Sequence, residues 1–412
     1  MLNKTVSKAE LLSPAGNPEK LKAAVLYGAD AVYLSGKHFG MRAAADNFKL
    51  DELKEACGFA HKNNVKVYLT VNVIPRTGEF QALKEYFRDI SDIGIDALIV
   101  ADPGVIALAK EMLPHIPLHL STQTSVVSAE TCIEYYKMGI SRIVLARELS
   151  LTDVIDIRRN TPDDLELETF IHGSMCVSWS GRCLLSEYFT GRDANCGACT
   201  QPCRWDYKLY YAVEDKRPDM PMPIMETENG TFIMSSRDMC MIEHIPELIE
   251  AGINSFKIEG RMKSAYYAAV TTNTYRMAID AYYSGNYEYN ADWMTELESV
   301  SHREYCTGYW YGHPINDANL CTQNGYLREK AYLATALESG AEGEYVSFIQ
   351  RNKAVCGEKA ELISPGKTGK EFTIEEMTND SGEAIESAPH PGMIFRIKAP
   401  FEIKEGDIIR SH

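Results

Sequence analysis

A short pattern that recurs four times constrains the fold of this 412-residue chain most strongly. In each copy a helical stretch is followed by a glycine and then by a short apolar run. The copies are Gly28–Leu34 (GADAVYL), Gly94–Val100 (GIDALIV), Gly139–Leu145 (GISRIVL) and Gly252–Ile258 (GINSFKI). Glycine suits the left-handed position that ends a helix, and the run after it is typical of a buried parallel strand. The repetition predicts alternating strands and helices.

Further apolar runs extend this series. They lie at 10–13, 66–72, 118–122, 165–171 and 231–234. With the four runs above, they give eight or nine strands between Glu10 and Glu259, which predicts an α/β fold of the TIM-like (β/α)8 barrel type. A doubly wound open sheet is the alternative, because hydrophobic periodicity does not distinguish the two.

The residue pattern changes near Tyr332. From there, short segments of alternating apolar and polar residues are separated by Gly, Pro, Asn and Asp. Such alternation predicts a small antiparallel β-barrel domain. We therefore predict a barrel over 1–285 with a cysteine-rich loop inserted at about 173–230, a helical joining segment over 286–331, and a β domain over 332–412.

Composition narrows the function classes. The formal charge is −16, from 58 acidic and 42 basic residues, which argues against indiscriminate nucleic-acid binding but leaves room for a local basic patch. No apolar stretch approaches the length of a membrane span, and the N-terminus lacks the apolar core of a secretory signal. We expect a cytoplasmic protein without a membrane partner, in which the eleven cysteines are free thiols or metal ligands.

Polar residues follow the predicted strands. Parallel barrels place their chemistry at the carboxyl ends of strands, so these residues are site candidates, although each has an alternative as a helix cap or a solvated loop residue. They are Ser35, Asn72, Asp102, Thr122, Gln123, Arg147, Glu148, His172, Glu259, Arg261 and Lys263. Arg261 and Lys263 together form a cationic pair that could hold a small dianion.

Five of the eleven cysteines fall between Cys176 and Cys203. Their spacing is Cys176-x6-Cys183-x15-Cys199-x3-Cys203, with Cys196 as an extra thiol, and Cys240 follows a later predicted strand. Four converging thiolates suit a tetrahedral zinc site or an iron–sulfur cluster. The x6 spacing is looser than the tight CxxC pairs of zinc sites, which favours iron–sulfur and leaves structural zinc as the alternative.

A nucleophilic cysteine is a third interpretation of this region, because His172 lies four residues before Cys176. Catalytic Cys/His pairs are generally assembled from distant segments, however. The sequence also lacks HExxH, GxSxG and P-loop motifs. These observations disfavour a hydrolase.

Eight motifs carry a family resemblance. They are Glu10–Gly16 (ELLSPAG), Gly28–Tyr33 (GADAVY), Glu168–Cys176 (ETFIHGSMC), Ser180–Ser186 (SGRCLLS), Arg192–Asn195 (RDAN), Gly197–Trp205 (GACTQPCRW), Ser235–Cys240 (SSRDMC) and Ser255–Lys263 (SFKIEGRMK). Together they resemble the collagenase-like peptidases, the unassigned peptidase family thirty-two, and the resemblance runs nearly end to end. Despite that label, the resemblance implies an oxygen-independent hydroxylation factor with a 4Fe-4S cluster.

The length, the β domain and Ala146–Ser150 (ARELS) are most similar to the transfer-RNA branch of this family. That branch implies prephenate-dependent hydroxylation of the tRNA wobble uridine to 5-hydroxyuridine, with tRNA and prephenate as ligands and a paralogous subunit as a possible partner. Peptidase activity and hydroxylation of another RNA, such as 23S rRNA, are the alternatives.

The resemblance also implies roles for individual residues. The cluster ligands fall on Cys176, Cys183, Cys199 and Cys240, with Cys203 as the main rival and Cys196 as a departure from the family pattern. The two carboxylates of prephenate require fixed cations, and the substrate-binding set is Asn72, Arg147, Lys257, Arg261 and Lys263. We assign the catalytic roles to His172 and Glu259.

Overall fold

A computed structural model of the chain provides the coordinates. It describes residues 8–41, 46–176, 179, 183–192, 194, 198–204, 225–227, 230–232, 237–285, 287–312, 327 and 329–412. The chain divides into two compact units. The first comprises Met1–Leu21, Asp30–Lys263 and His302–Tyr326, and the second comprises Lys22–Ala29, Ser264–Ser301 and Leu327–His412.

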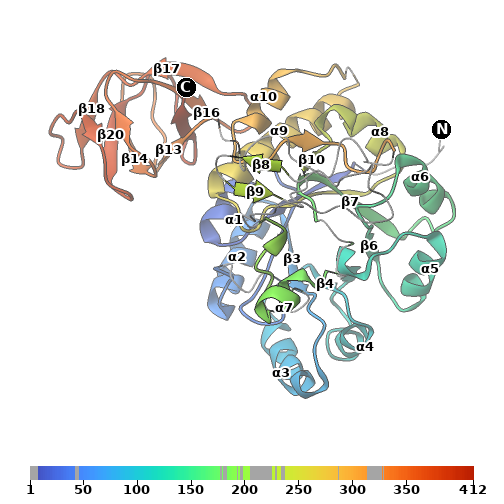
Figure 1. Cartoon of the computed structure of the whole chain (residues 1–412). Helices are drawn as coiled ribbons and strands as arrows, with labels where there is room; N and C mark the ends of the chain where they lie inside the picture. Colours follow the sequence, from blue (N-terminus) through green and yellow to red (C-terminus); the bar gives the residue numbers. More distant parts are fainter. Residues whose placement is uncertain are drawn as a thin grey trace. The chain divides into compact units, whose positions relative to one another are not determined.

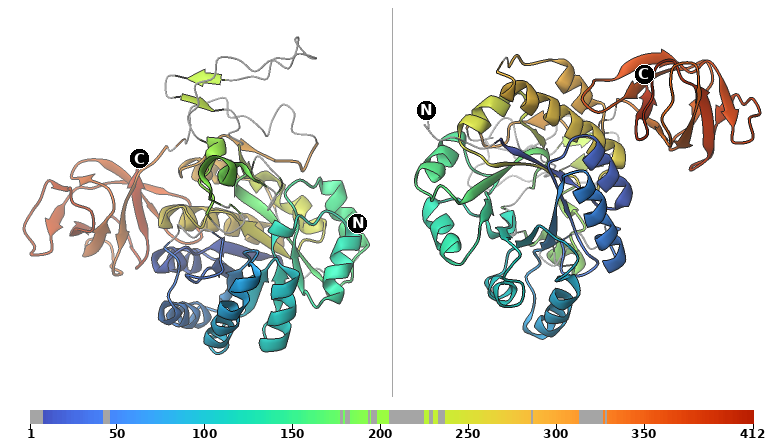
Figure 2. Two further views of the ribbon diagram at one scale, coloured as in Figure 1. Left: turned by 60° about the horizontal axis from the view of Figure 1, so that its bottom comes forward. Right: turned by 180° about the vertical axis from the view of Figure 1, so that it is seen from behind.

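The first unit is built on a closed ring of eight parallel strands (Figure 2). They are β1 (Glu10–Pro14), β2 (Ala31–Leu34), β3 (Lys66–Val71), β4 (Ala97–Val100), β5 (Leu118–Leu120), β6 (Arg142–Val144), β7 (Glu166–Ser174) and β11 (Ser255–Ile258). Each strand pairs with the next, and β11 pairs with both β7 and β1. This double pairing closes the sheet, so the predicted TIM-like barrel is confirmed and the open sheet is excluded.

Helices that follow the strands surround the ring (Figure 1). They are α2 (Leu50–Lys62), α3 (Phe80–Ile90), α4 (Pro103–Met112), α5 (Ala129–Lys137), α6 (Leu151–Arg159) and α8 (Ile245–Glu250), while α1 (Pro18–Leu26) spans the boundary between the two units. Helix α3 buries Leu83, Phe87 and Ile90, a spacing that lines one face of a helix. The four glycines of the recurring pattern have φ between +81° and +98°, as helix-ending glycines require.

Short elements of the first unit complete the description. They are the 3-10 turns η1 (Thr77–Glu79), η2 (Thr122–Thr124), η4 (Pro202–Arg204) and η5 (Ile242–His244), the helix α7 (Leu185–Thr190), and the strands β8 (Met225–Thr227), β9 (Gly230–Phe232), β10 (Asp238–Cys240) and β12 (Tyr305–Cys306). Among the described helices, none combines the length and apolar character needed to cross a bilayer.

The prediction that the run at 231–234 forms a barrel strand was wrong. The run at 231–234 contributes β9, which pairs with β8 in a separate two-stranded sheet. The strand after it, β10, pairs antiparallel with β7, so that Cys240 lies opposite His172, and it pairs parallel with β12. An apolar run predicts extended backbone, but its partner depends on tertiary pairing that periodicity does not encode.

The second unit contains two helices and a curled antiparallel sheet. The helices are α9 (Ala265–Tyr283) and α10 (Asp292–Glu298). The sheet has the order β17 (Lys370–Thr373), β16 (Lys359–Ile363), β21 (Ile408–Ser411), β13 (Tyr332–Ala336), β14 (Tyr345–Gln350), β20 (Ile394–Lys398) and β18 (Met377–Asn379), and β15 (Ala354–Val355) pairs with β19 (Ser387–Ala388). The predicted antiparallel β domain is therefore confirmed, and α9 and α10 group with it.

A buried charge network joins the helices of the second unit to its sheet. Arg410 of β21 is 1% exposed. Its guanidinium lies 2.7 Å from both a Glu296 and a Glu361 carboxylate oxygen and donates to Ser299 Oγ at 2.8 Å. One cation thus bridges carboxylates from α10 and β16, and Lys330 also pairs with Glu361.

We expect Arg410→Met to lower the free energy of unfolding by about 3–5 kcal/mol, because it leaves Glu296 buried without a cation, whereas Glu361 keeps its ion pair with Lys330. Urea unfolding followed by circular dichroism measures the change. Lys359→Met is the control, since Lys359 pairs with Glu371 on the surface and such pairs contribute at most about 1 kcal/mol. Equal effects of the two substitutions would contradict the role of Arg410.

Candidate functional site

A cavity opens in the first unit where the barrel strands end. Its lining includes residues that immediately follow strands, among them Asn72 after β3, Ser121 after β5 and Glu259 after β11. Of the residues selected from the sequence, it contains Asn72, Thr122, Gln123, Arg147, Cys176, Lys257, Glu259 and Arg261. The strand-end argument therefore predicts most of the polar lining.

The described lining of the cavity is positively charged. It contains three cations, Arg147, Lys257 and Arg261, and one carboxylate, Glu259, which leaves a net charge of +2. The chain as a whole carries −16. A concentration of cations in a concave site favours an anionic ligand.

Arg147 and Glu259 form an ion pair in the cavity wall. Arg147 Nη2 lies 3.1 Å from Glu259 Oε2, and Nη1 donates to the Ser174 carbonyl oxygen at 2.9 Å. The guanidinium carbon is 3.9 Å from the ring centroid of Phe170, an arrangement typical of a cation–π contact. These contacts fix the orientation of a mostly buried guanidinium.

Two glycines hold the loop that carries Glu259 and Arg261. The Glu259 amide donates to the His172 carbonyl oxygen at 2.9 Å, and a Cβ on Gly173 would lie 2.4 Å from the Glu259 carbonyl oxygen. A Cβ on Gly16 would lie 2.2 Å from the Arg261 carbonyl oxygen. Both glycines belong to the family motifs, but no role was predicted for them from the sequence. Each glycine lies at, or just after, the end of a predicted strand, and this position could have indicated a close backbone contact.

Hydrogen bonds to neighbouring groups orient the other polar side chains that line the cavity. Asn72 Nδ2 donates to Ser121 Oγ at 3.1 Å, and its Oδ1 accepts from the Met41 amide at 3.2 Å. Arg261 Nη1 donates to Thr70 Oγ1 at 3.0 Å. Ser121 and Thr70 line the cavity, and sequence reasoning missed both of them.

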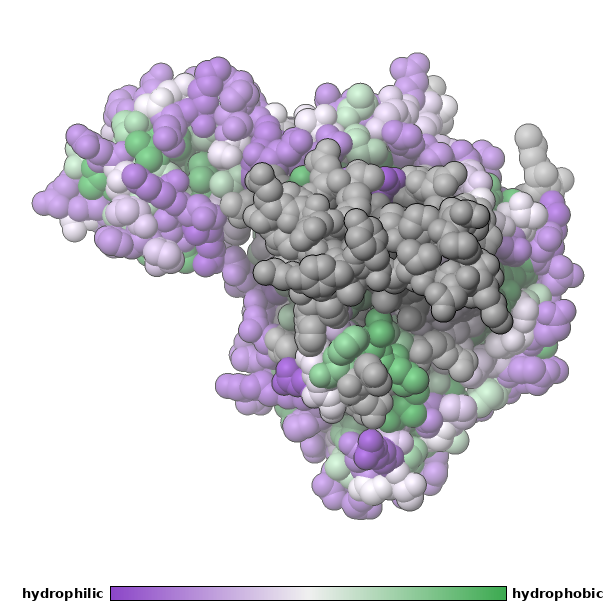
Figure 3. Space-filling view, in the orientation of Figure 1, coloured by the Kyte–Doolittle hydropathy of each residue, from purple (hydrophilic) through white to green (hydrophobic). Residues whose placement is uncertain are grey.

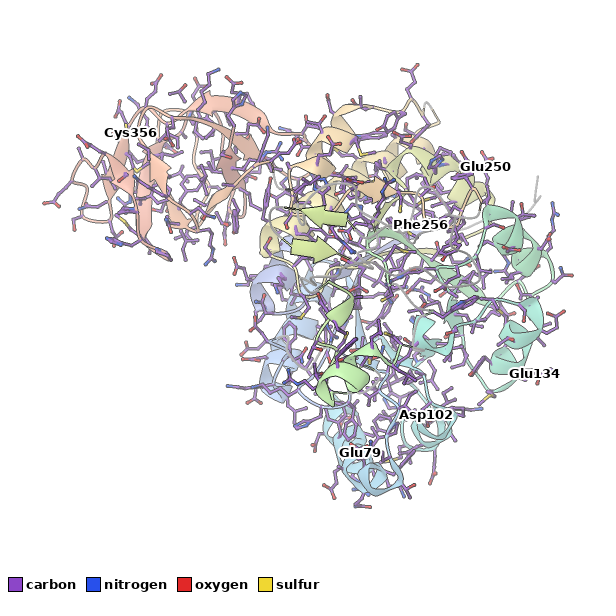
Figure 4. All side chains as sticks on the ribbon, in the orientation of Figure 1. Glu79, Asp102, Glu134, Glu250, Phe256 and Cys356 are labelled. Atoms are coloured by element: carbon purple, nitrogen blue, oxygen red, sulfur yellow. The ribbon has the colours of Figure 1, made fainter. Side chains whose placement is uncertain are left out.

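Some strand-end candidates do not line the cavity in the described part of the chain. They are Ser35, Asp102, Glu148, His172 and Lys263. Asp102 caps α4, where its Oδ1 accepts from the amides of Gly104 at 2.8 Å and Val105 at 3.0 Å. Figure 4 shows Asp102 at the start of α4, well apart from the buried Phe256 of β11.

His172 lies in a buried cluster with residues of β10 and β12. Its ring centroid is 5.3 Å from that of Tyr305. Burial lowers the pKa of His172 to about 3 against the opposing effect of the Asp238 carboxylate, and His302 and Lys263 act in the same direction as burial. Lys263 therefore acts electrostatically on this cluster, and the structure does not bring it together with Arg261 in the cavity lining. The catalytic assignment of His172 stays a prediction.

The predicted ligand cysteines occupy different environments. Cys176 is exposed and lines the cavity, Cys183 is half-buried, Cys199 is exposed, and Cys240 is buried in β10. In the register of β10 and β7, Cys240 lies opposite His172, which precedes Cys176 by four residues. Within the described residues, no three His, Cys, Asp or Glu side chains are grouped to hold a metal ion.

Hydrogen bonds do join the segments that carry two of these thiols. Ser186 Oγ accepts from the Thr200 amide at 3.0 Å, and the two hydroxyls lie 3.1 Å apart. Ser186 follows Cys183 by three residues, and Thr200 follows Cys199 directly. Cys203 is half-buried in η4, and Cys196 lies outside the described residues. The thiols suit a cluster chemically, but those in the described part of the segment are not grouped as ligands of one, so the ligand set stays a prediction.

The fold and the cavity define a class of two-unit proteins in which a closed parallel barrel carries a positively charged cavity and an antiparallel β domain follows it. The chain belongs to peptidase family U32, whose model matches residues 16–319, and the model of the U32 C-terminal domain matches residues 328–410. The resemblance found in the sequence is thereby confirmed.

Several curated relatives are similar over much of this chain. It is 36% identical to tRNA hydroxylation protein P1 of Bacillus subtilis over 98% of its own length and 94% of that protein. It is 33% identical to tRNA hydroxylation protein P of Escherichia coli, covering 96% of this chain and 95% of that protein. It is 38% identical to the 23S rRNA 5-hydroxycytidine C2501 synthase of Escherichia coli, over 66% of this chain and 40% of that protein.

Proposed function

We propose that this protein is an RNA-modifying enzyme that hydroxylates the wobble uridine of tRNA to 5-hydroxyuridine and requires prephenate. The names of the full-length relatives support an RNA hydroxylation role. The observation that carries the proposal for this chain is the cavity with a net charge of +2 at the mouth of a barrel. The sequence resemblance supplies the choice of prephenate.

The cavity offers chemistry suited to a cyclic dicarboxylate. Guanidinium groups bind carboxylates through paired donors, which suits Arg147 and Arg261, and the Lys257 ammonium supplies a third charge. Tyr33 and Phe170 add aromatic surface to the lining. Glu259 orients Arg147 through their ion pair, and we propose Glu259 as the catalytic carboxylate because it is the one carboxylate in the described lining.

The uridine must leave the stacked anticodon loop to reach such a cavity. The segment after β7 exposes apolar and aromatic side chains that could stack on a base. Apolar side chains gather over α7 (Figure 3), where Phe189 is 50% exposed, and Trp179 in the same segment is 48% exposed. We propose this segment as the contact for the unstacked nucleotide.

We also propose that Cys176, Cys183, Cys199 and Cys240 bind a 4Fe-4S cluster. Their spacing, their thiol chemistry and the hydrogen bonds between the segments of Cys183 and Cys199 support this set. When bound, such a cluster would supply electron transfer or an open iron site.

Nucleoside analysis of tRNA tests the function directly. In a strain that lacks this gene and any paralogue, we expect 5-hydroxyuridine derivatives to disappear, to return with the wild-type gene, and to stay absent with Cys176→Ala. Cys57→Ala is the matched control, because Cys57 is a buried cysteine of α2 that does not line the cavity, and burial raises its pKa to about 12. It should restore the derivatives fully.

Metal analysis of the same variants separates the cluster from the reaction. Anaerobically purified wild-type protein should contain about four irons and four sulfides per chain, and Cys176→Ala should lose most of them. One zinc without iron would refute the cluster. Unchanged tRNA nucleosides with loss of 5-hydroxycytidine from 23S rRNA would refute the tRNA substrate in favour of rRNA.

Peptidase activity finds less support in the cavity. A cysteine peptidase needs a histidine beside its thiol. The described lining contains Cys176 but no histidine, and the nearby His172 is buried in another cluster.

A further inference from the structure

A carboxylate beneath the cavity holds one of its cations in place. Lys257 Nζ lies 2.8 Å from Glu168 Oε1 and 4.6 Å from the ring centroid of Tyr33. Lys257 lines the cavity, whereas Glu168, which is 1% exposed, is not among the lining residues. The ammonium therefore faces the ligand space on one side and a buried carboxylate on the other.

Glu168 is itself fixed by a second cation. Its other carboxylate oxygen, Oε2, lies 3.3 Å from Arg142 Nη1, so the carboxylate bridges a lysine from β11 and an arginine from β6. The side chain of Arg142 is 3% exposed. Each oxygen of Glu168 is thus engaged by one cation, which leaves the carboxylate little freedom to rotate.

Arg142 is anchored by carboxylates from two further positions. Its Nε donates to Glu166 Oε2 at 2.8 Å, and its Nη1 donates to Glu10 of β1. Glu10 Oε2 accepts from the Tyr68 hydroxyl of β3 at 2.7 Å. Burial alone would raise the pKa of Glu10, but Arg142 holds that pKa below its usual range. The network therefore ties five barrel strands together.

The charges of this network balance. Its inner members are two carboxylates, the mostly buried Glu10 and the buried Glu168, and two buried cations, Arg142 and Lys257. Its more exposed members, Glu166 and Lys66, also have opposite charges. A buried ammonium is costly unless a carboxylate pairs with it. A lysine ammonium carries three donors, and within the described residues the hydrogen bond to Glu168 uses one of them. The others are available to an anion in the cavity.

We infer that Glu168 is a positioning residue: it holds the Lys257 ammonium at the floor of the cavity, oriented to donate to one carboxylate of a dianionic ligand. This inference rests on the proposed function only for the identity of that ligand. Glu168 contacts neither the ligand nor the reacting atoms, so its effect must pass through Lys257.

A double-mutant cycle tests this dependence. The dissociation constants of prephenate and of inorganic phosphate are measured by calorimetry on the full chain for wild type, Glu168→Gln, Lys257→Met and the double variant. We expect Glu168→Gln to raise the dissociation constant about tenfold or more in the wild-type background, the effect of a lost charge-assisted hydrogen bond. In the Lys257→Met background the same substitution should change it less than about twofold.

The matched control is Glu296→Gln in the second unit. Glu296 is also buried and also pairs with an arginine, and its loss should leave both dissociation constants unchanged. Should Glu168→Gln fail to fold by circular dichroism, Glu168→Asp, which keeps the charge but shortens the reach, takes its place in the cycle.

The outcomes separate the two proposals. Equal effects of the Glu168 substitution in both backgrounds would overturn the positioning role, because they would show that Glu168 acts independently of Lys257. Phosphate binding with the expected coupling, but no prephenate binding, would support the role of Glu168 and refute prephenate as the ligand. Absence of binding by both probes in the wild type would refute both.

Discussion

Replacing Arg147 by methionine should weaken prephenate binding by about 100-fold or more and remove 5-hydroxyuridine from tRNA in the complemented strain. The substitution lowers the net charge of the cavity lining from +2 to +1. It also leaves Glu259 without the guanidinium that lies 3.1 Å away. Truncating one member of a buried charge pair costs about 2–5 kcal/mol in binding, partly because the other charge is left unpaired.

Two further variants show whether this loss arises in the cavity. Arg147→Met combined with Glu259→Gln also removes the negative charge of Glu259, so it should recover part of the lost affinity but none of the modification. Arg88→Met removes an exposed cation from α3 and should bind prephenate normally. Prephenate affinity that is the same in Arg147→Met and in the wild type would show that the ligand binds elsewhere.

Replacing Gly173 by alanine should disable the same site through the backbone. Gly173 has a φ of +103°, which non-glycine residues adopt only with strain, and the added Cβ would lie 2.4 Å from the Glu259 carbonyl oxygen. The chain must move at β7 or at the loop after β11. We expect a loss of about 1–3 kcal/mol in unfolding free energy and loss of measurable prephenate binding.

Gly58→Ala is the control for this substitution. Gly58 lies within α2, where an added Cβ meets no atom within 4 Å, so alanine should stabilise the helix by about 0.5–1 kcal/mol. Urea unfolding and calorimetry measure both variants. Normal prephenate affinity in Gly173→Ala would show that the loop carrying Glu259 tolerates displacement. The close contact between Gly173 and Glu259 would then not be required for ligand binding.

The sequence predicted the barrel well because its elements are marked locally. Each glycine of the recurring pattern ends a helix in a left-handed conformation, and the apolar run after it forms a barrel strand. The run at 231–234 carries the same apolar signal but pairs outside the barrel as part of β9. The predicted pairing of this run was wrong because strand formation depends on local sequence, whereas the choice of a partner strand depends on the tertiary structure.

The candidate site also contains residues that the sequence predicted correctly and residues whose positions only the tertiary structure shows. Asn72, Arg147, Glu259 and Arg261 were predicted because parallel strands bring their carboxyl ends to one rim, and all four line the cavity. Lys263 was predicted with Arg261, two residues away, yet its charge acts on the His172 cluster. Whether a residue after a strand lines the cavity depends on the path of the loop and the direction of the side chain. Residue spacing alone does not give either of these.

The amino-acid sequence by itself determined where helices end, which runs form strands, and which polar residues follow those strands, since each depends on neighbours along the chain. Tertiary structure alone decided which charges meet. Lys257 meets Glu168 across 89 positions, and Arg142 meets Glu10 across 132. These contacts exist because β11 closes the sheet between β7 and β1, and closure turns distant side chains toward one shared interior.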